Sequence, residues 1–446
     1  MIDAATAVIY SVMSSFVQPL NDADDTRPSV LLIITGGTAC MVPNEEGSLA
    51  PRAGYLASQI RAMPELNTSE DDAAAASGGG DGAAPATDRW SVGAPGTPGA
   101  PHSADMLSST APRLDIEEVS PLIDSSDMGP DEWVKIAQLV ERRYYDYTGF
   151  VIVVGTDTMA YFASALSFML ENLGKPVVVT GAMIPFAVPW TDARRNIVSS
   201  VFVAATVEVP EVCIFFNETL LRGNRVTKID NAGSVPYASP NFPPLGVFRM
   251  KRVRLEHRLL APQPRGRFRV STSMHCRIVV VALVPGFDDA CLHAMLRAPP
   301  PPGTGAPGGA RPPVDAVVLE TYGVGNAPQR KTGLFDFVRE AVAAGVVVVV
   351  CSQCLRGSVE FGAYACGSQL ARLGAISCGN ATVEAISTKL AYVLGKTAGR
   401  GLPYAEVCRL VQTPLRGEMG DAPRGGGGGG GGHEGGGGLF AAVSKL

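Results

Sequence analysis

Continuous β-branched runs that end in glycine- and threonine-containing turns restrict the fold of this sequence more than any other feature. Three of them are Val30–Ile34, Phe150–Val154 and Val177–Val179. Each run is apolar throughout, which is typical of strands covered on both faces. An amphipathic helical pattern at 159–173 follows the second run, with Gly174 as its natural stop. Alternating strands and helices predict a parallel α/β fold.

A second group of strand-like runs lies in the C-terminal half. The runs are Ile278–Val284, Ala316–Leu319 and Val346–Val350, interleaved with helical patterns at 331–344 and 382–394. A chain of 446 residues also exceeds what one hydrophobic core usually supports. We therefore predict a second, smaller α/β domain.

The domain boundaries follow from where these patterns stop. We place the larger N-terminal domain, with a mostly parallel sheet and helices on both faces, at 28–254. The smaller, parallel α/β domain is placed at 274–422, after a basic, proline-broken linker at 255–273. Residues 1–20 have no basic region typical of a secretory signal, so we expect a local helix or arm there.

Three tracts of low complexity interrupt this pattern. An Ala/Gly/Ser/Pro tract covers about 68–111, a Pro/Gly tract covers about 297–313, and a polyglycine tract covers 425–438. Such compositions bury too little apolar surface to offset the entropy of ordering the chain. We expect a disordered insertion, a second insertion and a disordered tail, respectively.

Composition excludes several classes of function. The net charge is -5, without the basic stripe that phosphate backbones require, so nucleic acid is not an expected partner. No apolar run approaches the roughly 20 residues that span a bilayer, so no membrane partner is expected. Nine cysteines, an odd number, favour reduced thiols in the cytoplasm. Cys351 and Cys354 lack a second pair that would complete a zinc site, and we assign them to packing, with no metal.

Candidate chemistry gathers at three predicted strand ends. Thr35–Thr38, Gly155–Thr158 and Thr180–Ala182 directly follow the three apolar runs of the first domain. Ligands of parallel sheets bind beyond the carboxyl ends of the strands, so these turns are expected to meet in one crevice. The second turn also fits a simple turn with a helix N-cap, because Thr and Asp are favoured caps.

A threonine hydroxyl is a poor nucleophile at neutral pH and needs a neighbouring base or a positive setting. Lys228, in the stretch R-G-N-R-V-T-K, is a candidate base if burial lowers its pKa. Asp157 next to Thr156 would act in the opposite direction, because a carboxylate favours the ammonium. A surface cation is the other interpretation of Lys228.

These motifs, taken in order along the chain, resemble the asparaginase family of bacterial-type, threonine-dependent amidohydrolases, and most closely its type I cytoplasmic branch. The likeness extends from about 30 to 418, outside the low-complexity tracts. Further matching stretches are Pro121–Met128, Ser164–Pro176, Tyr322–Gln329 and Ala381–Leu390.

The resemblance implies hydrolysis of L-asparagine to L-aspartate and ammonia without a cofactor, by homodimers or homotetramers. Thr38 would be the nucleophile that forms an acyl-enzyme. Thr156, Asp157 and Lys228 would form a second triad that activates a hydroxyl or the hydrolytic water. Glutamine is the main substrate ambiguity, because one methylene is worth only about 1–3 kcal/mol.

Substrate-binding residues are implied in the same way. Asp124 and Ser125 match the loop that binds the α-carboxylate and α-ammonium, and Asp157 matches a further contact to these groups. Ala182 matches the residue whose backbone amide helps to form an oxyanion site, a contribution worth several kcal/mol when donors are preorganised. Tyr364 matches a tyrosine that the type I branch keeps near its site.

Two positions depart from the family pattern. Ser48 stands where the mobile loop usually carries a tyrosine, and Tyr55 or Tyr364 are the candidates to compensate. Glu320 stands where type I members carry an arginine that helps to bind a regulatory asparagine. A carboxylate there repels the effector carboxylate, so we expect weak or absent activation by asparagine.

Three other functions remain open from the sequence alone. The same family supplies an amidase subunit of a tRNA-dependent amidotransferase. A nucleotide-binding protein would use Thr35–Thr38 as a phosphate loop, although the full glycine pattern is missing. A catalytically dead sensing protein would fit Ser48 and Glu320, whereas the retained Thr38 and Lys228 argue against it.

Overall fold

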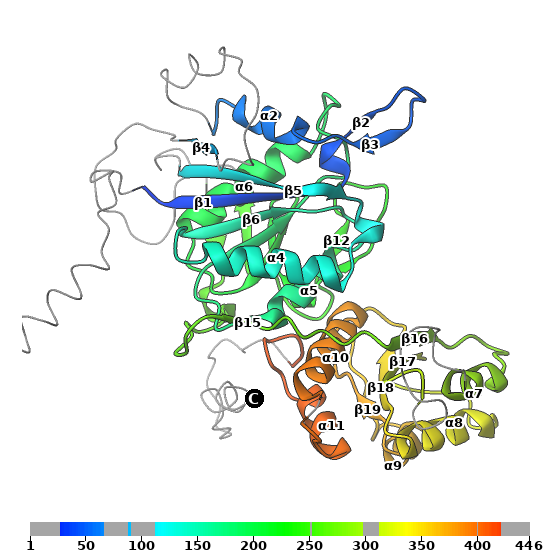
Figure 1. Cartoon of the computed structure of the whole chain (residues 1–446). Coiled ribbons are helices and arrows are strands. Elements are labelled where there is room, and N and C mark those ends of the chain that lie inside the picture. Colours follow the sequence, from blue (N-terminus) through cyan, green and yellow to red (C-terminus); the bar gives the residue numbers. More distant parts are fainter. Residues whose placement is uncertain are drawn as a thin grey trace, which may run out of the picture.

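A computed structural model gives the fold (Figure 1). It describes residues 27–66, 88–90, 112–249, 252–297, 312–398 and 400–420. The N-terminal arm and the polyglycine tail lie outside these residues, as do nearly all of the two predicted insertions. Within the first predicted insertion the structure describes Asp88–Trp90 alone, which form strand β4, so disorder of the insertion stays a prediction.

The larger sheet has nine strands among the described residues, in the order β14-β13-β10-β9-β8-β6-β1-β5-β4. Their bounds are β1 Ser29–Gly36, β4 Asp88–Trp90, β5 Arg113–Ile123, β6 Gly149–Val153, β8 Val177–Thr180, β9 Val212–Phe216, β10 Thr219–Arg222, β13 Gly246–Arg249 and β14 Arg252–Leu255. The pairs from β9 through β5 are parallel, and those of the outer strands are antiparallel. The predicted mostly parallel sheet is confirmed.

Helices cover both faces of this sheet (Figure 1). Helices α4 (Pro130–Arg143) and α5 (Met159–Met169) lie on one face, and α2 (Tyr55–Arg61) and α6 (Ala193–Thr206) lie on the other. Successive residues of β1 pack alternately into the two cores, and burying each such side chain stabilises the fold by roughly 1.5–3 kcal/mol. This double burial explains the continuous apolar runs.

Helix α5 is shorter than its sequence pattern predicts. It ends at Met169, and Leu170–Glu171 forms β7 instead of continuing the helix to Gly174. Strand β7 pairs with β15 (Arg269–Val270), which belongs to the predicted linker. This long-range pairing overrides the local helical pattern.

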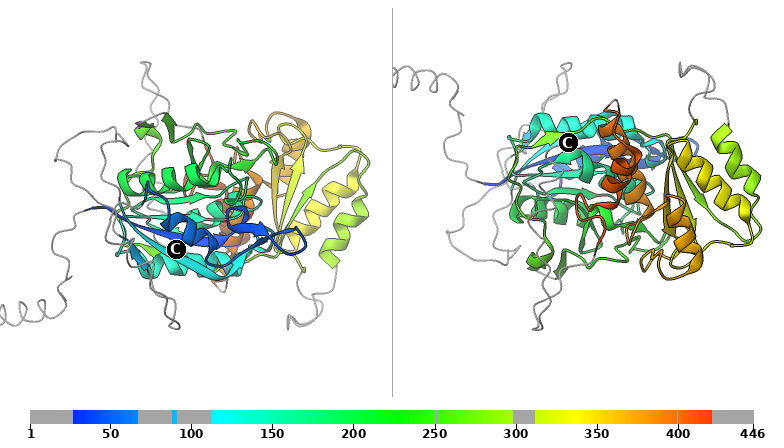
Figure 2. Two further views of the ribbon diagram at one scale, coloured as in Figure 1. Left: turned by 90° about the horizontal axis from the view of Figure 1, so that it is seen from above. Right: turned by 90° about the horizontal axis from the view of Figure 1, so that it is seen from below.

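The second sheet has the order β16-β17-β18-β19, and all of its pairs are parallel. Its strands are β16 Ile278–Ala282, β17 Ala316–Thr321, β18 Val347–Ser352 and β19 Ile376–Ser377. The helices of this part are α7 Asp289–Arg297, α8 Thr332–Ala343, α9 Ala365–Arg372, α10 Val383–Thr397 and α11 Tyr404–Gln412. The predicted second α/β fold is confirmed, and Figure 2 shows it at one end of the larger domain.

Helix α10 joins the two domains by packing against α5. The buried Glu171 carboxylate accepts hydrogen bonds from Tyr392 Oη at 2.8 Å and from Lys396 Nζ at 2.5 Å, both on α10. Among the described residues, no helix is both long and apolar enough to cross a bilayer.

Candidate active site

The turn after β1 and the turn after β6 meet where the strand order changes direction. From β1 the chain proceeds to β5 on one side and then to β6 on the other. Such a switch point opens a crevice at the carboxyl ends of the strands. In Figure 1 these ends lie on the right, where β12 (Tyr237–Ala238) is also found.

Glycines let the backbones of these turns touch. A Cβ on Gly37, whose φ is 79°, would collide with the Cα of Gly155 and lie 2.9 Å from the carbonyl carbon of Val154. A Cβ on Gly155 would in turn collide with Ser125, at 2.7 Å from its Oγ. The turns that carry Thr38 and Thr156 therefore lie in contact, and the loop that carries Ser125 lies against the second of them.

Thr38 begins a short 3-10 helix (Thr38–Cys40) directly after β1, and its side chain is half-buried. The end of β1 is fixed from within, because the Thr35 hydroxyl donates to the Val153 carbonyl at 3.0 Å. Within the described ranges no hydrogen bond involves the Thr38 hydroxyl. This leaves it available for a substrate.

Thr156, Asp157 and Lys228 form one cluster. The Lys228 ammonium donates to Thr156 Oγ1 at 3.0 Å and to Asp157 Oδ1 at 2.6 Å. Thr156 is 6% exposed, whereas the Asp157 side chain is 70% exposed. The lysine therefore bridges a buried hydroxyl and an exposed carboxylate while its own side chain is 17% exposed, which excludes the simple surface-cation interpretation.

The Thr158 side chain of the second turn does not cap helix α5, although the sequence allowed that interpretation. Thr158 occupies the N-cap position of α5 but makes no capping hydrogen bond. Its hydroxyl instead donates to the Ser125 carbonyl at 2.7 Å. Thr158 thus links the turn after β6 to the loop that carries Ser125, a role that was not predicted from the sequence.

Tyr237 is a further site residue that sequence reasoning missed. It pairs with Lys228 across the hairpin formed by β11 (Thr227–Lys228) and β12. Its hydroxyl donates to the Thr156 carbonyl at 2.6 Å. Burial, with the negative charge of Asp157 adding to it, raises the pKa of Tyr237 well above its usual value, so the phenol stays a donor. The available signal was the turn sequence D-N-A-G between the two strands.

Asp124 and Ser125 lie in the loop after β5, and Ser125 is in contact with the Gly155 backbone. Asp124 Oδ1 accepts from Ser126 N at 2.9 Å and from Ser126 Oγ at 2.6 Å. These hydrogen bonds lower the pKa of Asp124, which keeps a negative charge beside the crevice.

Ala182 is fully buried just beyond the end of β8, next to the end of β6. Gly181 packs directly on the Val154 carbonyl, where a side chain would not fit. The following amides, Met183 N and Ile184 N, donate to the Asp192 carboxylate at 3.0 Å each. The Ala182 backbone is therefore held in place at the same edge of the sheet.

The structure does not bring Tyr364 to the other candidates. It lies 59% exposed at the start of α9, in the second domain, and among the described residues its side chain makes no hydrogen bond with them. Ser48 lies in the exposed loop between β2 (Met41–Pro43) and β3 (Leu49–Pro51), where its amide donates to Asn44 Oδ1 at 2.8 Å. Tyr55 starts α2, with Arg52 over its ring.

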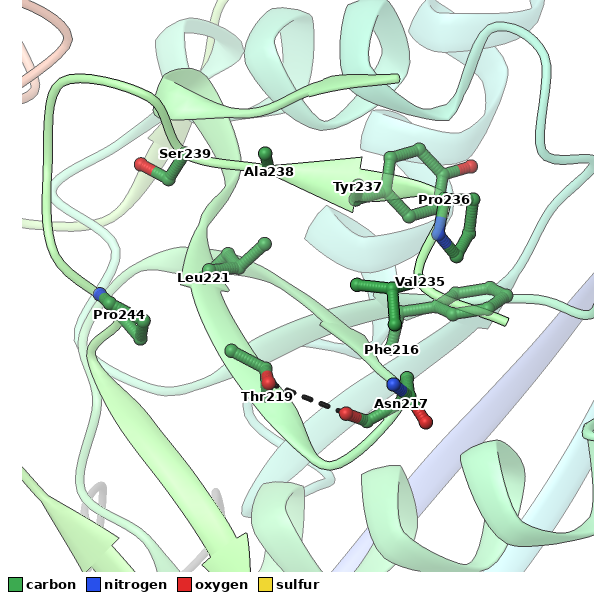
Figure 3. A pocket seen from close by; sticks show the side chains of 10 residues that line it. All are labelled: Phe216, Asn217, Thr219, Leu221, Val235, Pro236, Tyr237, Ala238, Ser239 and Pro244. Carbon is green, nitrogen blue, oxygen red and sulfur yellow. Dashed lines mark hydrogen bonds between the residues drawn. The ribbon is translucent and has the colours of Figure 1, made fainter. Parts of the chain in front are cut away.

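A cavity of about 200 Å³ lies beside the cluster. Tyr237 is one of its lining residues (Figure 3), and its hydroxyl donates to the Thr156 carbonyl, which is not part of the lining. The remaining lining residues are Phe216, Asn217, Thr219, Leu221, Val235, Pro236, Ala238, Ser239 and Pro244. The cavity therefore adjoins the candidate site, and neither Thr38 nor Thr156 lines it.

Cysteines and other metal-binding side chains form no metal site among the described residues, because no group of three or more of them comes together. Cys351 is buried as a packing residue, whereas Cys354 is exposed, so the packing prediction was wrong for Cys354.

Two family models and several known proteins match this chain. Residues 29–261 match the family model "Asparaginase, N-terminal", and residues 277–401 match "Glutaminase/Asparaginase C-terminal domain". The chain is 38% identical to L-asparaginase 1 of Escherichia coli over 396 residues, covering 88% of this chain and 98% of that protein. A 60 kDa lysophospholipase of mouse is 41% identical over 303 residues, covering 68% of this chain and 50% of that protein.

The crystal structure of L-asparaginase I from Vibrio cholerae gives a TM-score of 0.69 at 36% identity, covering 89% of this chain and 100% of that one. A glutamyl-tRNA(Gln) amidotransferase subunit of Pyrococcus abyssi is more distant, at 31% identity over 335 residues, covering 71% of this chain and 70% of that protein. The fold and the matches together define a two-domain α/β amidohydrolase. The chain belongs to the asparaginase family.

Proposed function

We propose that this chain hydrolyses the side-chain amide of L-asparagine to L-aspartate and ammonia through an acyl-enzyme on Thr38. The observation that carries the proposal is the Lys228 ammonium, bonded to both Thr156 and Asp157 beside the Thr38 turn. The 38% identity to a bacterial L-asparaginase supports the choice of substrate.

In the first half-reaction the Thr38 hydroxyl oxygen attacks the amide carbon of the substrate. The carbonyl becomes an oxyanion, for which the Ala182 backbone amide is the donor we assign. Collapse of this intermediate breaks the C–N bond, and the amide nitrogen leaves as ammonia with the proton from the Thr38 hydroxyl. An aspartyl ester on Thr38 remains.

In the second half-reaction water attacks the ester, and Thr38 recovers its proton as L-aspartate leaves. We assign Thr156 and Lys228 to the proton transfers, because their hydroxyl and ammonium are 3.0 Å apart. Asp157 stabilises the ammonium each time that Lys228 holds the proton. Because the Asp157 carboxylate is exposed, we also assign it to the α-ammonium of the substrate.

Asp124 supplies the second negative charge for the α-ammonium, and its lowered pKa keeps that charge in mildly acidic solution. Ser125, which touches the Gly155 turn, is assigned to the α-carboxylate. Recognition of both charged groups would favour free amino acids over larger amides.

The test is ammonia release by the purified full-length chain. We expect turnover of L-asparagine with a higher kcat/KM than L-glutamine. An ester-cleavage assay with a lysophospholipid, suggested by the mouse relative, is expected to give no product. Lack of ammonia from asparagine under conditions where a bacterial L-asparaginase is active would refute the proposal.

Three further assignments belong to this proposal. We place the protein in the cytoplasm, in agreement with the nine free cysteines. We expect a homodimer or homotetramer, which light scattering tests. The domain boundaries 28–254 and 274–422 are supported by the two family-model matches. The amidotransferase alternative is less favoured, because those relatives are more distant.

A further inference from the structure

The strand that carries Lys228 is held by the second domain. Arg225, just before this strand, donates through Nε and Nη2 to the carbonyls of Gly417 and Gly420, each at 2.6 Å, and through Nη1 to Asn380 Oδ1 at 3.0 Å. Asn224 Nδ2 donates to the Arg416 carbonyl at 3.1 Å. The R-G-N-R segment thus serves as an inter-domain contact.

Thr227 continues this contact one residue before the lysine. Its hydroxyl donates to Glu384 Oε1 at 2.7 Å, and Glu384 is buried in the first turn of α10. Consecutive side chains of a strand point to opposite faces. Thr227 therefore faces α10 while Lys228 faces the Thr156 turn, so the Glu384 contact supports the strand from behind.

We propose that Glu384 is a positioning residue for Lys228, acting across the domain boundary through the Thr227 hydroxyl. The inference rests on the proposed asparagine hydrolysis. A two-stranded hairpin is at best marginally stable by itself. This one, with two residues in each strand, is fixed on one side by Tyr237 and on the other by Glu384.

The lysine side chain is long and flexible, so the position of the Lys228 ammonium depends on how firmly the strand that carries it is held. Lys228 must hold one ammonium on two acceptors at 3.0 and 2.6 Å, which requires its Cα to stay in place. A displacement of about 1 Å can cost about 10²-fold in rate. Loss of the Thr227 contact is thus expected to lower kcat more than it raises KM.

The experiment compares five full-length variants with the wild type. Glu384→Ala and Thr227→Val remove the contact, whereas Glu384→Gln and Thr227→Ser keep an acceptor or a donor. Lys396→Met is the matched control, because Lys396 also bonds from α10 to the first domain, through Glu171, without touching the Lys228 strand. Readouts are kcat and KM for asparagine, melting temperature, and a crystal structure of Glu384→Ala.

We expect Glu384→Ala and Thr227→Val to lower kcat by roughly 10–100-fold with KM changed by less than about threefold. The Gln and Ser variants should keep kcat within about threefold of wild type, and Lys396→Met should lower the melting temperature without lowering kcat. In the crystal structure, Lys228 Nζ should no longer contact Thr156 Oγ1.

An unchanged kcat in Glu384→Ala or Thr227→Val would overturn the inference, as would an equal loss in Lys396→Met. If the wild type itself releases no ammonia, the proposed function fails, and the crystal structure alone decides the inference. An undisplaced Lys228 would then overturn it. If Glu384→Ala does not fold, Thr227→Val and its serine control give the answer.

Discussion

Gly37 packs against the backbone of Gly155, so that the turns carrying Thr38 and Thr156 are in direct contact. A Cβ on Gly37 would collide with Gly155, and a Cβ on Gly155 would collide with Ser125, so each position requires glycine for a different neighbour. The meeting of two strand ends thus depends on the two residues that have no side chain.

Substituting Gly37 by alanine should therefore separate the two turns. We expect Gly37→Ala to lower kcat/KM for asparagine by at least about 10²-fold, because reacting groups misplaced by about 1 Å lose about that much. Gly362→Ala is the control, since a Cβ there meets no atom within 4 Å. Equal activity of the two variants would show that the contact has no role.

Replacing Lys228 by arginine tests proton transfer rather than charge. Arginine keeps the positive charge but does not give up its proton in proteins, and its planar head does not fit a lysine position. We expect Lys228→Arg to be as inactive as Lys228→Met in an ammonia-release assay. Substantial activity in the arginine variant would assign Lys228 a purely electrostatic role.

Burial of Glu384 predicts a pH dependence of stability. Burial raises the pKa of this carboxyl, so between its unfolded pKa of about 4.3 and its raised folded pKa the native state holds more protons than the unfolded state. The free energy of unfolding therefore falls in this window as pH rises. Urea denaturation should show this fall in the wild type and a smaller one in Glu384→Gln. Identical pH profiles would contradict the assignment.

Glu320 predicts simple kinetics. It lies half-buried near the end of β17, where burial raises its pKa, and the resemblance to the type I branch implies that an effector-binding arginine usually stands there. We expect hyperbolic dependence of initial rate on asparagine concentration. Sigmoidal curves that become hyperbolic when Glu320 is mutated would contradict this expectation.

Much of the fold was predictable because it depends on local patterns. The apolar runs at 30–34, 150–154 and 177–179 identified β1, β6 and β8, since a strand buried on both faces must be apolar throughout. The end of α5 was not predictable, because pairing of β7 with β15, distant in the chain, stops the helix at Met169. Strand β4 was not predicted, because its residues lie within a tract of low-complexity sequence.

The candidate site was predictable where residues follow strand ends. Thr156 and Asp157 lie beside Lys228 as the motifs indicated. Tyr237 and Glu384 do not follow strand ends of the first sheet, so this rule did not find them. Tyr237 contacts the cluster through the Thr156 carbonyl, and Glu384 contacts it only through the Thr227 hydroxyl. Tyr364 was selected by resemblance alone, and its side chain lies 59% exposed at the start of α9 in the second domain.

The most direct test of the central claim is the initial rate of ammonia release from L-asparagine by Thr38→Ala and Thr156→Ala. Thr206→Ala is a matched control, because that hydroxyl only bonds to a carbonyl within α6. We predict a loss of at least about 10³-fold in kcat for both site variants and none in the control. A rate close to wild type in either site variant would contradict the two-threonine mechanism.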